Sequence, residues 1–558
     1  MTQLLDVFGF LSVVLRGLTL ALQSMVAGGL VFALFVARGE AGPAAARACR
    51  RLLLASALGL AVAQAAYVAA DAAILMGTAG LDLAGVAGAN FFVAGVVGTA
   101  LALAVAALVW TAPGSEAASG RRRRTRQLAA ALALALGLVG AAVATSHAAA
   151  RLEDRALPLA LTALHQAATA CWIGGLPYLL LALARAPDAA AARAVAGRFS
   201  RLAQASVAVL VAAGIGLAAI YVGSPAAILG SAYGAMLGTK AMLLALLLCL
   251  GTLNMRLVRR AEAGDLSGLA RLRRFAEAEV GIGFTVILAA ASLTSQPPAA
   301  DLSPHDLVSV PEIEARLAPR PPRLVPPAAD ERLPPSLRTV TAGADPRRSA
   351  AQALATYMSY VPGQLVEPPT PGEMALSEFN HNVSGLVVLI SGLLAVAARA
   401  GWRWARNWPL AFLLLAVFLF LLADVEYWPL GPVPFWRGFL VAEALQHRLA
   451  VLLIVAFALF ERRVQIGAAT WPATALVFPF VCFLGGALLL THSHSLNNPK
   501  DQLLVELSHS SIAILGVAAG WSRWLELRLP DGPRRAISWI WPICLILVGA
   551  VLLDYRES

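Results

Sequence analysis

The stretch RRRRTRQLAAALALALGLVGAAVATSH, residues 121–147, begins with a cluster of arginines, continues as an apolar run and ends close to a histidine. As an α-helix, residues 127–147 would be about 30 Å long, which matches the hydrocarbon core of a bilayer. Arginine-rich loops beside such a run stay on the cytoplasmic side. The stretch therefore predicts a transmembrane helix that leads from an inner arginine cluster to an outer histidine.

The same pattern repeats along the chain. Of its 558 residues, 59% are hydrophobic and only 13% are charged, whereas ordinary soluble domains carry about 25% charged residues. The chain is therefore predicted to be an all-α, polytopic helical membrane protein. Fourteen transmembrane helices are predicted, at residues 8–36, 52–75, 90–112, 127–147, 157–184, 202–222, 234–255, 275–295, 382–398, 408–424, 439–460, 472–491, 502–523 and 536–553.

Most arginines lie in alternate turns between these helices, as in RRRRTR and in RAGWRWAR at residues 399–406. The positive-inside rule places these turns in the cytoplasm and both termini in the periplasm. Topology and anionic lipid then account for the net charge of +11, so no nucleic-acid partner is expected.

The chain divides at residues 296–380, which are rich in proline and charge, as in PEIEARLAPRPPRLVPPAADERLPP. Such a segment cannot cross a membrane. We therefore predict an eight-span domain at residues 1–295, a periplasmic proline-rich segment at 296–380 and a six-span domain at 381–558.

With this topology, all eight histidines fall on the outer side of the membrane. Histidine is the commonest metal ligand, and ionisable groups inside a membrane mark functional sites. The chain is therefore predicted to handle a metal at its outer face; a polar, water-filled vestibule without a ligand is the alternative. The predicted metal ligands are His147, His165, His381, His447, His492, His494 and His509.

Several acids lie near these histidines in the six-span domain and would anchor the imidazole N–H groups. Helical spacing places Glu443 on the face of His447, and Glu506 on the face of His509. Asp424 and Glu426 follow the tenth helix.

Four segments in the first half of the chain resemble the CopD-type family of copper-resistance membrane proteins. They are TSHAAARLEDRALPLALTALHQAATACWIGGL, RFSRLAQASVAVLVAAGIGL, GSAYGAMLGTKAMLLALLLCLGTLNMR and RRFAEAEVGIGFTVILAAASLTSQPP. The resemblance covers about residues 1–298, and His147, His165, Trp172 and Lys240 match its motifs. It implies movement or management of copper at the bacterial inner membrane, beside a periplasmic CopC-like copper carrier. The chain departs from the family where Ser146 replaces the usual glycine, and in having no fused CopC-like domain.

Two further side chains have alternative interpretations. Lys240, inside the seventh helix, is either a fixed charge that opposes cation leak or a lysine that snorkels to the interface. Cys171 is either one of a series of soft Cu⁺ ligands or a small apolar residue. The five cysteines show no CxxC pair, so no disulfide framework is expected.

The sequence thus predicts a copper-transport or copper-homeostasis protein of the bacterial inner membrane, in which periplasmic-side histidines capture Cu⁺ or Cu²⁺. One alternative is a membrane oxidoreductase that holds haem b between His447 and His509. Another is an assembly factor that delivers copper to a periplasmic cuproenzyme. The sequence contains no GxxxxGK[ST] or DKTG-like motif, so ATP use is not expected.

Overall fold

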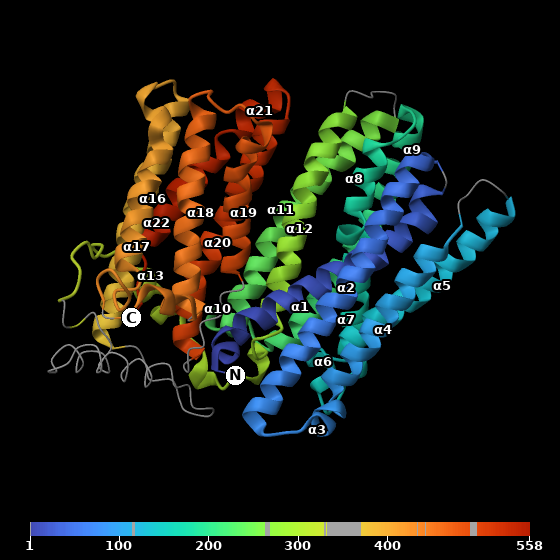
Figure 1. Ribbon diagram of the computed structural model, residues 1–558, viewed down its shortest axis with the longest axis horizontal. Helices are drawn as coiled ribbons and strands as arrows, with labels where there is room; N and C mark the ends of the chain where they lie inside the picture. The colour runs from blue at the N-terminus through green and yellow to red at the C-terminus, as the bar shows by residue number, and fades with distance from the viewer. Residues whose placement is uncertain are drawn as a thin grey trace. The chain divides into compact units, whose positions relative to one another are not determined.

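A computed structural model describes residues 2–38, 40–113, 118–262, 268–328, 331, 370–431, 433–440, 442–490 and 499–557. Within these ranges there are helices but no β-strand, and fourteen helices are long and apolar enough to cross a membrane (Figure 1). The predicted all-α, polytopic fold with fourteen spans is therefore confirmed. The periplasmic placement of the termini stays a prediction.

The helices of the first half follow one another in order. They are α1 (Thr2–Val31), η1 (Phe32–Ala37), α2 (Gly42–Ala79), α3 (Leu83–Ala87), α4 (Asn90–Thr111), α5 (Ala118–Val143), α6 (His147–Ala150), α7 (Ala156–Thr169), η2 (Ala170–Gly174), α8 (Leu176–Ala184), α9 (Ala189–Val222), α10 (Pro225–Gly230), α11 (Ala232–Glu262), α12 (Leu269–Leu293) and η4 (Ala299–Asp301).

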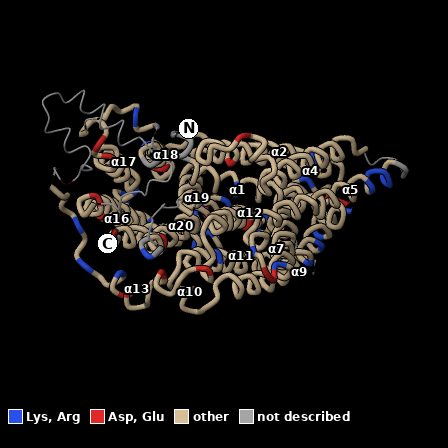
Figure 2. Tube along the Cα trace, turned by 90° about the horizontal axis from the view of Figure 1, so that it is seen from below, with Lys and Arg blue, Asp and Glu red and all other residues tan. Residues whose placement is uncertain are grey.

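The second half continues with η5 (Pro304–Asp306), α13 (Val310–Leu317), α16 (Pro371–Arg399), η6 (Trp404–Leu410), α17 (Ala411–Leu422), η7 (Phe435–Leu440), α18 (Ala442–Gln465), η8 (Pro472–Leu476), α19 (Val477–Leu489), α20 (Pro499–Arg528), α21 (Asp531–Ile537) and α22 (Ile540–Leu553). Figure 2 shows that most of the chain carries no charged residues and that basic residues are gathered in short segments, such as the start of α5.

Packing divides the chain into two compact units. The N-terminal unit comprises residues 11–225 and 240–301, and the C-terminal unit comprises residues 1–10, 226–239 and 302–558. The main division at residue 301 lies close to the domain boundary predicted at residue 295. Two short segments from the first half of the chain, residues 1–10 and 226–239, also belong to the C-terminal unit. Residues 329–330 and 332–369 of the predicted periplasmic segment lie outside the described residues, so this domain assignment stays a prediction.

In the N-terminal unit, glycines allow the backbones of α1 and η2 to touch. A Cβ added at Gly174 would lie 1.9 Å from the backbone oxygen of Ser24, and one added at Gly28 would lie 2.1 Å from the backbone oxygen of Ala170. Membrane helices lack a strong hydrophobic drive to associate, so close backbone contact at small residues is their main source of packing energy. The glycines of the WIGGL segment therefore fix where α1 crosses this bend.

Replacing Gly174 by alanine is expected to destabilise the protein by about 3 kcal/mol, because the new methyl group must push two backbones apart. The measurement is the apparent melting temperature of purified full-length protein in detergent. Gly140→Ala is the matched control, since a Cβ there meets nothing within 4 Å. Equal melting temperatures for the two variants would contradict the packing argument.

The C-terminal unit is a helical bundle in which α16 packs on α22, α20 packs on α19 and α22, and α17 packs on α18. Its apolar core is built around Trp408 and Trp541, whose ring centroids are 5.4 Å apart. Phe412, Phe457 and Phe478 complete this core.

A buried network of charges lies beside this core. Arg523 of α20 forms 2.8 Å ion pairs with Glu461 of α18 and with Glu526, one turn further along α20. Glu526 also accepts hydrogen bonds from Arg399 of α16 and, at 2.7 Å, from the indole of Trp541 on α22. Two cations, two anions and one indole thus connect four helices.

Candidate metal-binding site

Two of the predicted ligands meet in the C-terminal unit. His381 on α16 and His509 on α20 have ring centroids 6.1 Å apart, with their planes at 71°. Because a metal–imidazole bond is about 2.0 Å long, two imidazoles that share one ion have ring centroids between roughly 5 Å apart in a tetrahedral arrangement and roughly 6.3 Å apart in a linear one. The spacing of this pair therefore suits a single bridging metal ion.

The backbone sets the tautomer of both imidazoles. Nδ1 of His381 lies 2.8 Å from the carbonyl oxygen of Ser377, and Nδ1 of His509 lies 2.9 Å from that of Val505. A carbonyl oxygen can only accept, so each Nδ1 carries the hydrogen and donates it one turn back along its own helix. In each neutral ring the lone pair is then on Nε2, which is the nitrogen that can bind a metal.

Tyr555 packs against both rings. Its ring stacks on His381 at a centroid distance of 3.8 Å and meets His509 edge-on at 5.9 Å. Its hydroxyl donates to Glu557 at 2.6 Å, and Glu557 also accepts a hydrogen bond from Ser377. Burial, and then the adjacent Glu557 carboxylate, raise the pKa of Tyr555, so the phenol keeps its proton. Tyr555 therefore orients the histidine pair.

The other residues predicted for this site have different surroundings. Nδ1 of His447 lies 2.7 Å from the Asp424 carboxylate, which is the arrangement expected of an anchoring acid. Glu506 is buried and accepts a hydrogen bond from Ser510, whereas the anchor of His509 is a backbone carbonyl. Glu426 is half-buried and its backbone pairs with Val433. His492, His494 and the side chain of Glu443 lie outside the described residues.

Within the described part of the chain, no three His, Cys, Asp or Glu side chains are grouped so that they could hold a metal ion. The pair of His381 and His509 is therefore a two-ligand arrangement there, and the predicted convergence of His447 with it stays a prediction. Two nitrogen ligands suit Cu⁺, which accepts low coordination numbers.

In the N-terminal unit, His147 lines a polar pocket of about 230 Å³ together with Arg16, Tyr67 and Thr294. Its Nε2 is buried and has no hydrogen-bond partner among the described residues. Burial lowers the pKa of His147, and Arg16 lowers it further, while Asp301 and the Thr294 carbonyl act against this. The imidazole is therefore neutral at neutral pH and able to coordinate, but a guanidinium lies nearby.

His165 occupies a different place in the same unit. Its Nδ1 lies 3.1 Å from the carbonyl oxygen of Leu210 on α9, and the Lys240 ammonium is close enough to act on it electrostatically. Cys171 follows in η2, and all five cysteines are unpaired, as expected. A metal held by His165 would be repelled by Lys240. The metal-binding roles of His147, His165 and Cys171 thus stay predictions.

Two groups of functional interest were not predicted from the sequence. Tyr555 and Glu557 follow the last helix without any motif that marks them. Glu279 and Asn254 are buried in the N-terminal unit. The signal for Glu279 was present, because an acid inside an apolar span is rare and usually functional.

Comparison with known proteins found two partial similarities, both to proteins named for copper. Residues 193–293, from α9 to the end of α12, match the family described as Copper resistance protein D. Over 181 residues the chain is 30% identical to the copper transport protein CutJ of Bacillus subtilis (strain 168). This alignment covers 32% of each protein, so the chain spans about a third of the length of that curated relative. No solved structure matches the chain.

The matched residues include two of the four segments quoted above in full and most of a third, together with Lys240. The fourteen apolar helices and this match together indicate a multi-pass protein of the bacterial inner membrane. The resemblance of the chain to the CopD-type copper-resistance family is thereby confirmed, with the family match lying at residues 193–293.

Proposed function

We propose that the protein transports or manages copper at the bacterial inner membrane and is not an enzyme. The observation that carries this proposal is the pair of His381 and His509, whose spacing and tautomers suit one metal ion. The family match at residues 193–293 and the relative named as a copper transport protein support copper as the metal.

The cargo would be Cu⁺, held by the two Nε2 atoms. Neutral imidazoles are good ligands for copper, and two of them leave room for a donor group to deliver or remove the ion. The arginine pattern predicts that α16 and α20 begin on the periplasmic side, and capture or delivery would then occur from that side. A periplasmic CopC-like carrier or a cuproenzyme would exchange copper with this pair.

The test is copper movement by the purified full-length protein in liposomes. We expect Cu⁺ to cross the bilayer faster than in protein-free liposomes, and we expect copper in the elemental analysis of the protein. Transport at the protein-free rate, or protein that binds no copper, would contradict the proposal. A Soret band in the purified protein would favour the haem alternative instead.

A further inference from the structure

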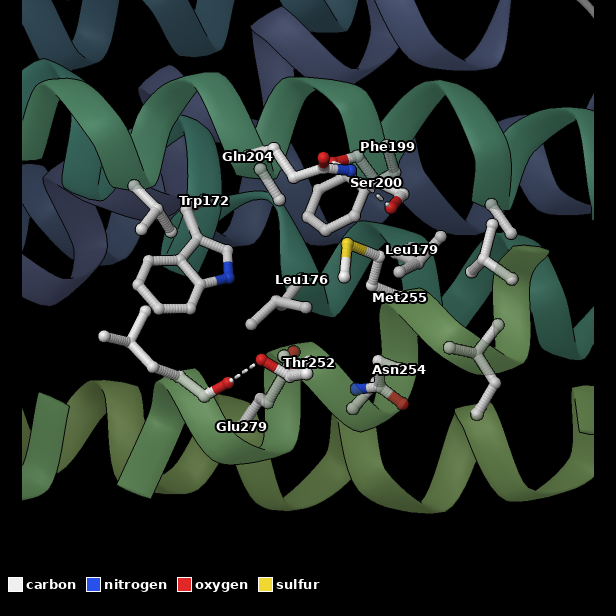
Figure 3. Close-up of a pocket in the computed structure, with 18 residues that line it drawn as sticks. Trp172, Leu176, Leu179, Phe199, Ser200, Gln204, Thr252, Asn254, Met255 and Glu279 are labelled. Atoms are coloured by element: carbon white, nitrogen blue, oxygen red, sulfur yellow. Dashed lines mark hydrogen bonds between the residues drawn. The ribbon is translucent and has the colours of Figure 1, made fainter. Parts of the chain in front are cut away.

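A cavity of about 220 Å³ lies in the N-terminal unit and is open on one side, where Gln204 and Thr252 are exposed. Figure 3 shows Trp172, Phe199 and Gln204 on one side of it, and Thr252, Asn254 and Glu279 on the other. These side chains come from η2, α9, α11 and α12. A water molecule takes about 30 Å³ in the liquid, so the cavity can hold several waters or a partly hydrated ion.

Glu279 and Asn254 are the buried polar residues of this cavity. Their exposed fractions are 3% and 7%, and the two side chains lie next to each other. Oε1 of Glu279 and both polar side-chain atoms of Asn254 have no hydrogen-bond partner among the described residues. Glu279 lies about 6 Å along α12 from Phe275, where the predicted eighth transmembrane helix begins, and it is enclosed by its neighbours at this depth.

An ionised carboxylate at this depth needs a positive partner, because an unpaired charge is strongly disfavoured in a low-dielectric medium. The described residues offer no such partner: Glu279 forms no ion pair there, and it is the one titratable side chain among those that line the cavity. Glu279 must therefore carry a proton or meet a cation that enters the cavity.

Glu277, two residues earlier on α12, shows the contrast. It forms ion pairs with Arg274 at 2.7 Å and with Arg273 at 3.8 Å. Its charge is balanced by its own helix, so it needs no external cation. The two acids thus provide a matched pair for testing.

We propose that Glu279, with Asn254, forms a cation-exchange site inside the membrane domain, where a proton and a Cu⁺ ion replace each other. Arriving Cu⁺ takes the place of the carboxyl proton: the O–H bond breaks, the carboxylate oxygen coordinates the ion, and the proton leaves to water. The net charge of the site is the same before and after. Met255, which lines the cavity, adds a thioether, a soft ligand that suits Cu⁺.

This proposal rests on the proposed copper function, and it adds that copper movement is exchanged for protons. The family match includes Asn254, Met255 and Glu279 but does not assign them a role.

The first experiment uses dicyclohexylcarbodiimide, which reacts with protonated carboxyls in apolar surroundings. Full-length protein in detergent is labelled, and the modified residues are located by mass spectrometry. We expect label on Glu279 and not on Glu277, and a severalfold decrease when Cu⁺ is added first. A Glu279 that is not labelled, or labelled equally with and without Cu⁺, would overturn the proposal.

The second experiment compares Glu279→Gln with Glu277→Gln in liposomes that contain a pH-sensitive dye. Wild type and Glu277→Gln should move protons against Cu⁺, whereas Glu279→Gln should lose this proton movement. If Glu279→Gln transports copper with unchanged proton movement, the exchange site is contradicted while the proposed copper function is still supported. If wild type transports no copper, the proposed function fails, and the labelling experiment alone decides whether Glu279 binds a cation.

Discussion

Replacing His381 and His509 together by alanine should weaken the binding of one copper ion by more than about 100-fold. Loss of a single group that only orients a metal ligand already costs about 10–100-fold in affinity, and here both ligands are removed. The measurement is the number of Cu⁺ ions bound per full-length protein, in competition with a chelator of known affinity. A double variant that binds as many Cu⁺ ions as wild type, with unchanged affinity, would show that these histidines only pack.

The control for this experiment is His305→Ala. His305 is exposed, and its backbone N–H donates to the Ser303 hydroxyl, so the imidazole takes no part in that contact. This variant should bind copper like wild type. An equal loss of copper binding in both proteins would indicate general damage to the fold and would contradict a specific site at His381 and His509.

The variant Tyr555→Phe should keep most of the copper binding, because the ring that stacks on His381 remains.

Acid should also reduce copper binding by the wild-type protein. Imidazolium cannot coordinate a metal, and the burial of His509 disfavours its charged form. Occupancy should therefore fall only well below the range near pH 6.5 in which an ordinary histidine gains its proton, and be lower at about pH 3.5 than at about pH 7.5. Binding that does not change between these two conditions would indicate that ligands other than histidine dominate.

The spans were predictable because the information for them is local. Length, hydropathy and the placement of arginines belong to each segment alone, so the run at residues 127–147 identifies its helix without knowledge of any neighbour. The close contact at Gly174 was predictable for the same reason, since a glycine pair in an apolar span permits backbone approach wherever the partner helix lies.

The composition of the site was less predictable, because it depends on which helices pack together. Nothing in the spacing of His381 and His509 indicates that α16 and α20 place them at the same level. The helical spacing rule made Glu506 the expected anchor of His509, yet the carbonyl of Val505 serves instead. A backbone carbonyl leaves no mark in a sequence. His447 of α18 pairs with Asp424, which follows α17, although the helical spacing rule had named Glu443 as its partner.

Replacing Arg523 by leucine should lower the free energy of unfolding by about 3–5 kcal/mol, the usual cost of breaking a buried ion pair. Arg523 is 4% exposed and pairs with both Glu461 and Glu526. After the substitution Glu526 keeps Arg399, but Glu461 loses its cation and is left charged in the interior. The variant is compared with wild type by its apparent melting temperature in detergent.

Arg463→Leu is the matched control, because this arginine lies on α18 close to Glu461 but is exposed. It removes the same charge and should change stability little. The double variant Arg523→Leu with Glu461→Leu should recover much of the lost stability, since no unpaired charge then remains in the interior. A loss for Arg523→Leu no larger than for Arg463→Leu would show that the apolar core around Trp408 and Trp541 holds the four helices together without help from the buried charges.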